Sequence, residues 1–197
     1  FPNCKFTLQK KQKGTADAVL CAKKYIPKNS SVLILFGDVP LINIKTLKRL
    51  SRSYLNNNLY GSMLTFESKN PFAYGRVITN KNKVIEVIEE LNATNEIKKI
   101  SIFNAGVMIT SYNLLFNYIN KINNKNIKRE KFLPDIFKIS YQENKAFNYI
   151  LCEENEMLGV NTLNDFYKID EIYQKNLKDK LINNGVQIID PNTLRVS

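Results

Sequence analysis

The stretch Leu35-Phe36-Gly37-Asp38-Val39-Pro40-Leu41-Ile42 decides how this chain is expected to fold. The apolar run that leads into it, Val32 to Phe36, predicts a buried parallel strand, and Pro40 prevents that strand from continuing. Ligands of open α/β sheets gather beyond the carboxyl ends of the strands, so Asp38 is well positioned to hold a divalent cation against nucleotide phosphates. The alternative is that Asp38 is only the N-cap of the segment that follows.

Helical and strand patterns alternate along the rest of the chain. The predicted helices cover about residues 15–25, 44–54, 112–122, 134–141 and 163–181, the last one ended by Gly185. The predicted strands cover 32–36, 62–66, 77–79, 84–88, 100–109 (interrupted at Asn104-Ala105-Gly106), 148–152 and 186–189, and residues 123–126 read as a loop tip. This alternation predicts an α/β fold with a mostly parallel sheet.

Length and composition narrow the class of protein. The 197 residues, 44 % of them hydrophobic, suffice for one substantial globular domain. No apolar run could span a bilayer and no leader is visible, and three scattered cysteines with no histidine make a disulfide framework or a zinc site unexpected. We therefore expect a cytoplasmic protein without membrane insertion.

The net charge of +11 has two readings. The lysines are scattered rather than gathered into a patch interleaved with aromatic residues, so we expect no nucleic-acid partner. A Lys/Asn/Ile bias is what an AT-rich genome would impose on solvated faces, and a basic surface would still favour an anionic small molecule.

Four further motifs occur in a characteristic order. They are Leu8-Gln9 followed by Gly14-Thr15, Pro71-Phe72-Ala73-Tyr74-Gly75-Arg76-Val77, Val87-Ile88-Glu89-Glu90 with Phe103-Asn104-Ala105-Gly106, and Met157-Leu158-Gly159-Val160-Asn161-Thr162. Together with Gly37-Asp38 they resemble the nucleotide-diphosphosugar pyrophosphorylases, in particular the N-acetylglucosamine-1-phosphate uridylyltransferases. The resemblance covers nearly the whole chain and implies a Rossmann-like domain.

For the nucleotide, the resemblance implies that UTP contacts one set of residues. This set is Gln9, Gly14, Thr15, Phe36, Gly37 and Asp38. A glutamine side chain both donates and accepts, which suits a uracil edge, and Gly14 lets the backbone approach the base closely. Thr15 stands at a helix N-terminus, which suits an acceptor-rich base or a phosphate. The competing reading is an ordinary Gly-Thr helix start.

For the sugar phosphate, the resemblance implies contacts from Gly75, Glu89, Asn104 and Asn161. Asp38 and Asn161 would hold Mg²⁺, with substrate phosphates completing its coordination, and Asp38 would act in catalysis through that metal. Plainer readings exist for each residue. Gly75 could be a strand entry beside an exposed Arg76, Glu89 a solvated charge, and Asn161 the N-cap of the last helix.

The implied reaction transfers uridylyl from UTP to N-acetylglucosamine 1-phosphate, giving UDP-N-acetylglucosamine and pyrophosphate for peptidoglycan and lipopolysaccharide precursors. Two other readings stay open, namely another sugar-1-phosphate nucleotidylyltransferase and a non-catalytic remnant. The chain also departs from the family pattern. Leu91 stands where the family usually has lysine, and Glu130-Lys131-Phe132-Leu133-Pro134-Asp135 stands where it has E-Y-Y-L-T-D.

The family's Gly-rich triphosphate loop has no match in the sequence. We therefore expect an internal fragment, inactive alone, in which residues 1–184 belong to the uridylyltransferase domain and lack its N-terminal part. Residues 185–197 would be a linker toward an absent left-handed β-helix domain. By resemblance, that domain would acetylate glucosamine 1-phosphate and make the parent a homotrimer.

Overall fold

The computed structural model describes residues 3–56, 59–68, 74–123 and 130–196. The chain divides into two compact units, one made of residues 1–36 and 44–153 and the other of residues 37–43 and 154–197. Pro71, Phe72 and Ala73 of the predicted sugar motif, and residues 124–126 of the predicted loop tip, lie outside the described residues. No helix within the described ranges is long and apolar enough to cross a membrane.

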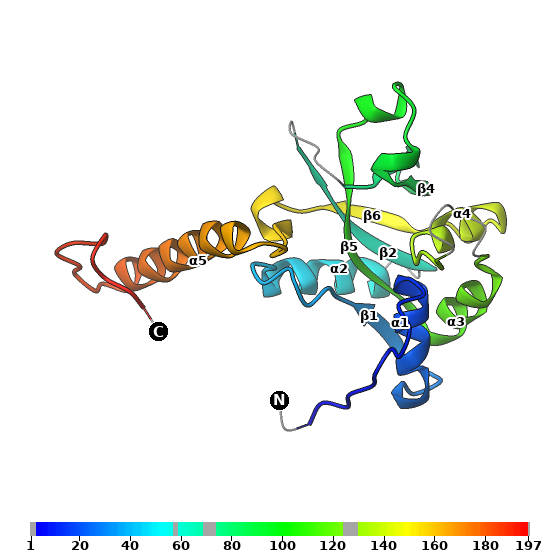
Figure 1. Cartoon of the computed structure of the whole chain (residues 1–197), viewed down its shortest axis with the longest axis horizontal. Coiled ribbons are helices and arrows are strands. Elements are labelled where there is room, and N and C mark those ends of the chain that lie inside the picture. The colour runs from blue at the N-terminus through cyan, green and yellow to red at the C-terminus, as the bar shows by residue number, and fades with distance from the viewer. Residues whose placement is uncertain (1–2, 57–58, 69–73, 124–129, 197) are drawn as a thin grey trace. The chain divides into compact units, whose positions relative to one another are not determined.

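The first unit combines a sheet with packed helices, as predicted (Figure 1). Its strands are β1 (Ser31–Ile34), β2 (Gly61–Glu67), β3 (Arg76–Asn80), β4 (Lys83–Ile88), β5 (Ile102–Ser111) and β6 (Asn148–Leu151). Its helices are α1 (Thr15–Ala22), α2 (Ile44–Asn56), α3 (Tyr112–Lys121) and α4 (Asp135–Gln142), with short 3-10 turns at Lys23–Tyr25, Glu90–Asn92 and Ile97–Lys99. The α/β class is thereby confirmed.

The sheet is mixed, so the expectation of a mostly parallel sheet was wrong. The strand order is β1-β5-β2-β6-β4-β3, with a further pairing of β3 to β5. Among the described strands, only β2 and β6 pair in parallel. The difference arises because β5 inserts antiparallel between β1 and β2, which run in the same direction.

The strand before the Gly37-Asp38 junction is shorter and less buried than predicted. It ends at Ile34, two residues before Phe36, and only Val32 of its four residues is buried. The reason is its position at the edge of the described sheet, where it pairs with β5 alone. Leu33 and Leu35 are accordingly 37 % and 45 % exposed.

The core lies on both faces of β2, all of whose residues from Gly61 to Phe66 are buried. Successive side chains of a strand point to opposite faces. Met63 belongs to the main apolar cluster, to which α1, α3 and α4 contribute Ala16, Leu115 and Phe137. Helix α2 packs against β2 and β5, so helices hold this part of the sheet in place.

The predicted interruption at Asn104-Ala105-Gly106 is a bulge inside a continuous strand. Met63 of β2 pairs with Met108, while Thr65 pairs with Asn104, so β5 carries extra residues at this point. Gly106 has a φ of 71°, a conformation that residues with a Cβ atom rarely adopt. The bulge bends the strand next to Asn104.

The second unit contains a 3-10 turn at Glu154–Met157 and the long helix α5 (Leu163–Asn183), ended as predicted by Gly185 with φ 87°. The N-cap of α5 is Thr162, whose hydroxyl accepts from the Asp165 N–H while the Asp165 carboxylate accepts from the Thr162 N–H. Asn161 is therefore not the N-cap. This capping box explains where the helix begins.

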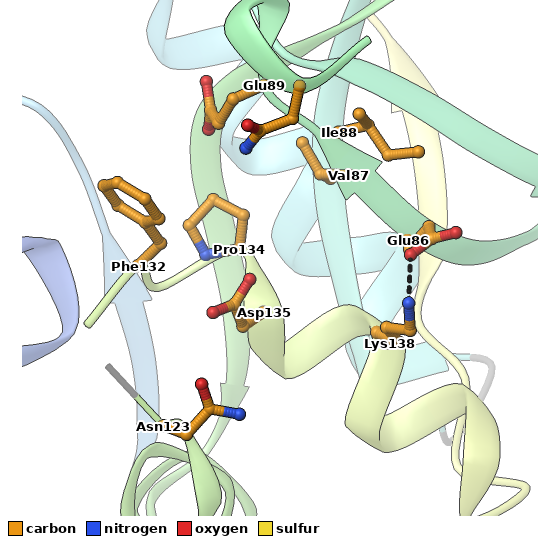
Figure 2. A pocket seen from close by; sticks show the side chains of 10 residues that line it. Glu86, Val87, Ile88, Glu89, Asn123, Phe132, Pro134, Asp135 and Lys138 are labelled. Carbon is orange, nitrogen blue, oxygen red and sulfur yellow. Dashed lines mark ion pairs between the residues drawn. The ribbon is translucent and has the colours of Figure 1, made fainter. Parts of the chain in front are cut away.

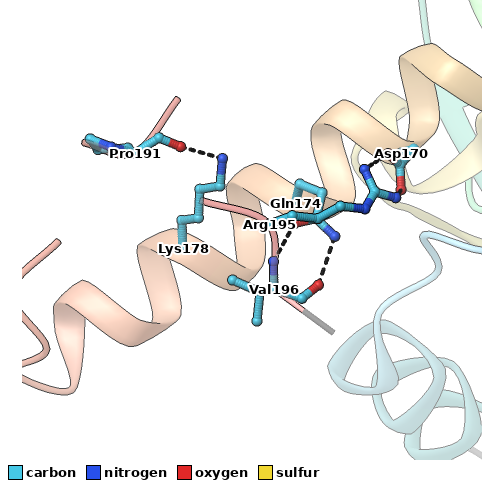
Figure 3. A network of polar contacts seen from close by, with 6 residues as sticks. All are labelled: Asp170, Gln174, Lys178, Pro191, Arg195 and Val196. Atoms are coloured by element: carbon cyan, nitrogen blue, oxygen red, sulfur yellow. Dashed lines mark hydrogen bonds and ion pairs between the residues drawn. The ribbon is translucent and has the colours of Figure 1, made fainter. Parts of the chain in front are cut away.

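Residues 186–189 form no strand, contrary to prediction, and Ile189 is 99 % exposed. The chain instead turns back along α5 (Figure 3). The half-buried Asp170 accepts two hydrogen bonds from Arg195, and Gln174 both donates to and accepts from the backbone of Val196 at 2.9 Å. These contacts fix the last described residues without strand pairing.

Candidate active site

Three predicted sugar-contacting residues meet because of the strand register. Arg76 of β3 pairs with Ile88 of β4 and also with Phe103 of β5, both antiparallel. Gly75, which precedes Arg76, therefore lies opposite Glu89, which follows Ile88. It also lies opposite Asn104, which follows Phe103. Gly75 is thus brought beside both Glu89 and Asn104, and the Asn104 N–H donates to the Gly75 carbonyl oxygen at 2.9 Å.

Gly75 allows this close approach because it lacks a side chain. A Cβ atom there would lie 2.8 Å from Cγ1 of Val87 and 3.5 Å from the carboxyl carbon of Glu89. The first distance is far shorter than normal van der Waals contact, so any larger residue would have to displace the Val87 side chain. Gly75 is buried and Glu89 is partly exposed, so the carboxylate lies at the surface end of this contact.

Glu89 borders a cleft of about 350 Å³ within the first unit. Figure 2 shows Glu89 on one side of the opening and Phe132, Pro134 and Asp135 on the other, with Glu86 and Lys138 at the far end. Lys138 and Glu86 form an ion pair at 2.8 Å. The cleft therefore offers an aromatic ring, carboxylates and carboxamides, which are groups that recognise sugars.

Burial raises the pKa of the Asp135 carboxyl above its usual value, and the nearby Lys138 opposes that change. The raised pKa reflects the partly desolvated base of the cleft. In the sequence, Asp135 belongs to a string that departs from the family pattern, and nothing there marks Phe132 or Lys138 as site residues. The sequence could not show that these residues lie near Glu89, because α4 and β4 come together only through tertiary packing.

Asn104 is oriented by the bulge. Its Oδ1 atom accepts from the Gly106 N–H at 2.9 Å, which leaves its amide hydrogens as donors. The ring of Phe36 lies over Gly106, where a Cβ atom would be only 2.8 Å from Cζ of that ring. Phe36, Asn104 and Leu133 also line one small cavity, so a predicted UTP residue and a predicted sugar residue are neighbours.

The predicted uracil box, residues 9–17, is held together by hydrogen bonds between its own residues. Gln9 donates to the Gly14 carbonyl at 3.1 Å and to the Asp17 carboxylate at 2.8 Å. Gly14 has a φ of 103°, and a Cβ atom there would lie 2.8 Å from the backbone nitrogen of Lys131. The close approach that requires this glycine in the structure is therefore made by the backbone of Lys131.

Three hydrogen bonds join this box to residues 131–133. The Ala16 N–H donates to the Lys131 carbonyl at 3.0 Å, the Lys131 N–H donates to the Lys13 carbonyl at 2.8 Å, and the Leu133 N–H donates to Thr15 Oγ1 at 2.9 Å. One N–H at the start of α1 is thus already bonded, whereas the Thr15 hydroxyl can still donate. The same segment continues into Phe132 and Pro134 of the cleft.

Asp38 and Asn161 lie together in the second unit. The Val160 N–H donates to the Asp38 carbonyl oxygen at 2.8 Å. A Cβ atom on Gly159 would lie 3.8 Å from the Asp38 carbonyl oxygen and 3.6 Å from the amide nitrogen of the Asn161 side chain. Both residues are exposed, and α2 begins only at Ile44, so Asp38 is no helix N-cap. A Cβ atom on Gly37 would meet no atom of the described chain within 4 Å.

This pair fits a cation that is completed by other ligands. Within the described ranges, no group of three or more Asp, Glu, Cys or His residues could hold a metal by itself. One carboxylate and one carboxamide oxygen, with water and phosphate oxygens, match the way Mg²⁺ is commonly held. Asp38 and Asn161 belong to one unit, while Gln9, Gly14, Thr15, Phe36, Gly75, Glu89 and Asn104 belong to the other.

Comparison with known proteins identifies the family. Residues 2–176 match the model of the nucleotidyl transferase family. The chain is 37 % identical over 189 residues to the "Bifunctional protein GlmU" of Thermosipho melanesiensis, covering 96 % of this chain and 41 % of that protein. It is 37 % identical to the protein of the same name from Buchnera aphidicola subsp. Acyrthosiphon pisum, covering 93 % and 40 %. The chain thus spans about two fifths of the curated relatives it matches.

Solved structures support the fold. A UDP-glucose pyrophosphorylase complexed with UDP-glucose aligns with a TM-score of 0.65 at 14 % identity, over 85 % of this chain and 64 % of that one. A CMP:2-keto-3-deoxy-manno-octonic acid synthetase complexed with CTP aligns with a TM-score of 0.61 at 13 % identity, over 86 % and 71 %. From the family match over residues 2–176 and the Rossmann-like α/β unit, we conclude that the chain belongs to the nucleotidyl transferase family.

Proposed function

We propose that this chain forms part of an enzyme that transfers uridylyl from UTP to N-acetylglucosamine 1-phosphate. The observation that carries the proposal is the meeting of Gly75, Glu89 and Asn104, of which Glu89 borders the cleft that Phe132 also lines. A carboxylate accepts sugar hydroxyls, a carboxamide donates to an acetamido oxygen, and an aromatic ring packs on a sugar face. The similarity to bifunctional GlmU proteins supports the same assignment.

In the proposed reaction, a phosphate oxygen of the sugar phosphate attacks the α-phosphorus of UTP. The bond from that phosphorus to the bridging oxygen of the β-phosphate breaks, and pyrophosphate leaves with the electron pair. No covalent bond to the enzyme is needed, so the chain's own residues act by positioning the substrates. Glu89 and Asn104 orient the sugar, and Gln9 with Thr15 orients the uracil.

Asp38 and Asn161 would hold Mg²⁺, which when bound neutralises charge on the reacting and leaving phosphates. We further propose that residues 1–184 belong to the uridylyltransferase domain and 185–197 to a linker, and that the whole protein is a cytoplasmic homotrimer. An additional domain would acetylate glucosamine 1-phosphate. The bifunctional character named for the relatives supports this last point.

The experiment is to measure pyrophosphate release by the whole encoded protein with UTP and a panel of sugar 1-phosphates. We expect N-acetylglucosamine 1-phosphate to be preferred over glucose 1-phosphate. Asn104→Ala should raise the KM for the acetamido sugar by roughly tenfold, since a lost buried hydrogen bond costs about 1–3 kcal/mol, and should leave the KM for UTP nearly unchanged. Asn82→Ala, in the exposed β3–β4 turn, is the control.

Two results would contradict the proposal. A preference for glucose 1-phosphate would point to another sugar nucleotidylyltransferase. Absence of pyrophosphate release with every sugar phosphate would favour the non-catalytic reading.

A further inference from the structure

Arg76 is an unusually buried arginine. Its side chain is only 2 % exposed, whereas arginines in proteins are mostly exposed unless they are paired. The guanidinium forms an ion pair with Glu90, donates through Nη1 to the Tyr74 carbonyl at 2.9 Å, and lies over the Phe103 ring, 5.1 Å from its centroid. The reading of Arg76 as an exposed residue beside a glycine was therefore wrong.

The partners of Arg76 flank the predicted sugar-contacting residues. The Tyr74 carbonyl belongs to the same planar peptide unit as the Gly75 N–H, so the bond from Arg76 fixes the direction of that N–H. Glu90 follows Glu89 directly and begins the 3-10 turn Glu90–Asn92, so the ion pair fixes the backbone just after Glu89. One side chain thus orients both sides of the Gly75–Glu89 contact.

Stability alone does not account for this arrangement. The Glu90 side chain is 32 % exposed, so the buried charge is the guanidinium, and an ion pair that desolvates a charge is often no more stable than a well-packed apolar contact of the same volume. In addition, Nε of Arg76 is buried and finds no hydrogen-bond partner among the residues that the structure describes. What an apolar side chain could not supply is the directional hold on the Tyr74 carbonyl and on Glu90.

We propose that Arg76 is a positioning residue that sets the enzyme's selectivity for the sugar phosphate by orienting Gly75 and Glu89. This inference rests on the proposed function and assigns a role to a residue that does not itself reach the substrate. Loss of the guanidinium frees the Tyr74–Gly75 peptide and the turn after Glu89. The sugar side of the reaction should suffer while the nucleotide side does not.

The test compares Arg76→Met, Arg76→Lys and Glu90→Gln in the whole encoded protein. We expect Arg76→Met to raise the KM for N-acetylglucosamine 1-phosphate about tenfold or more, to change the KM for UTP less than about twofold, and to reduce the preference over glucose 1-phosphate. Arg76→Lys should recover part of the effect, because an ammonium can reach Glu90 without the planar fork that also serves Tyr74. Arg52→Met, on the exposed face of α2, is the matched control.

The outcomes separate the two claims. If the unsubstituted protein uses the acetamido sugar and the variants raise both KM values equally, or lower only the melting temperature, the role of Arg76 is overturned while the proposed function stands. If Arg76→Met does not fold, Glu90→Gln decides: an unchanged KM for the sugar phosphate overturns the inference. If the unsubstituted protein turns over no sugar phosphate, both claims fail together.

Discussion

The hydroxyl of Thr15 accepts a hydrogen bond from the backbone N–H of Leu133 at 2.9 Å, which joins the start of α1 to one side of the cleft. Leu133 is only 4 % exposed, so its N–H has little access to water if this acceptor is lost. The contact therefore gives Thr15 a role in holding the cleft that is separate from any contact with UTP.

Thr15→Val keeps the shape of the side chain and removes the acceptor. We expect it to destabilise the protein by about 1 kcal/mol, the usual cost of an unsatisfied backbone donor, whereas Thr15→Ser should be nearly neutral. Melting temperatures of the two variants check this. Equal melting temperatures for valine and serine would show that the hydrogen bond contributes nothing.

Gly14→Ala should be strongly destabilising. The residue has a φ of 103°, and the new Cβ would lie 2.8 Å from the Lys131 nitrogen, so both strain and overlap oppose it. We expect a loss of roughly 1–3 kcal/mol. Gly37→Ala is the control, because its new Cβ would meet no atom of the described chain within 4 Å. Similar unfolding free energies for the two variants would refute the proposed constraint.

Tyr118 should make stability depend on alkaline pH. Burial, reinforced by the neighbouring Glu143 carboxylate, raises the pKa of its phenol from 10.0 to about 12. Folding thus favours the protonated phenol, and this contribution is complete below pH 10 and lost as the pH rises toward 12. A shift of this size sets an upper limit of about 2–3 kcal/mol, because the Glu143 side chain is 36 % exposed and water screens its charge.

The measurement compares unfolding free energies of the protein and of Tyr118→Phe at about pH 8 and about pH 11. The variant should lose less stability between the two conditions. Tyr167→Phe, at a tyrosine that is 63 % exposed, should behave like the unsubstituted protein. Parallel pH profiles for the protein and Tyr118→Phe would contradict the assignment.

Asp38→Asn in the whole protein should reduce turnover by about tenfold to a hundredfold, because it removes the only charged protein oxygen proposed for Mg²⁺. Raising the Mg²⁺ concentration should restore part of the activity. Asp165→Asn, which affects the start of α5, is a control for local disturbance. Unchanged turnover and unchanged Mg²⁺ dependence would remove Asp38 from the site.

The sequence predicted the helices and most strands because their apolar periodicity is local. It could not predict that β5 runs antiparallel between β1 and β2, since an apolar run reads the same in either direction. Residues 186–189 have the composition of a strand, but a strand also needs a partner, and the turn along α5 provides none. The interruption predicted at Asn104-Ala105-Gly106 was located correctly, but the strand continues through it as a bulge.

For the candidate site, motif resemblance located Gly75, Glu89 and Asn104, and the register explains why they meet. Contacts between distant segments were not foreseeable. The pairing of Gly14 with Lys131 depends on how residues 130–135 return to α1, and the burial of Arg76 depends on Glu90 across the β3–β4 hairpin. The assigned roles of the individual site residues remain predictions.

The unequal number of neighbours of β1 and β3 has a consequence for local opening. Among the described strands, β1 is paired on one side, whereas β3 is bonded to both β4 and β5 near Arg76. Amide protons of a strand exchange with solvent when its hydrogen bonds open, and edges open most readily. Deuterium should therefore enter the amides around Val32 before the amide of Arg76, which means that the β3 position next to Gly75 stays closed through fluctuations that already release the strand leading to Gly37.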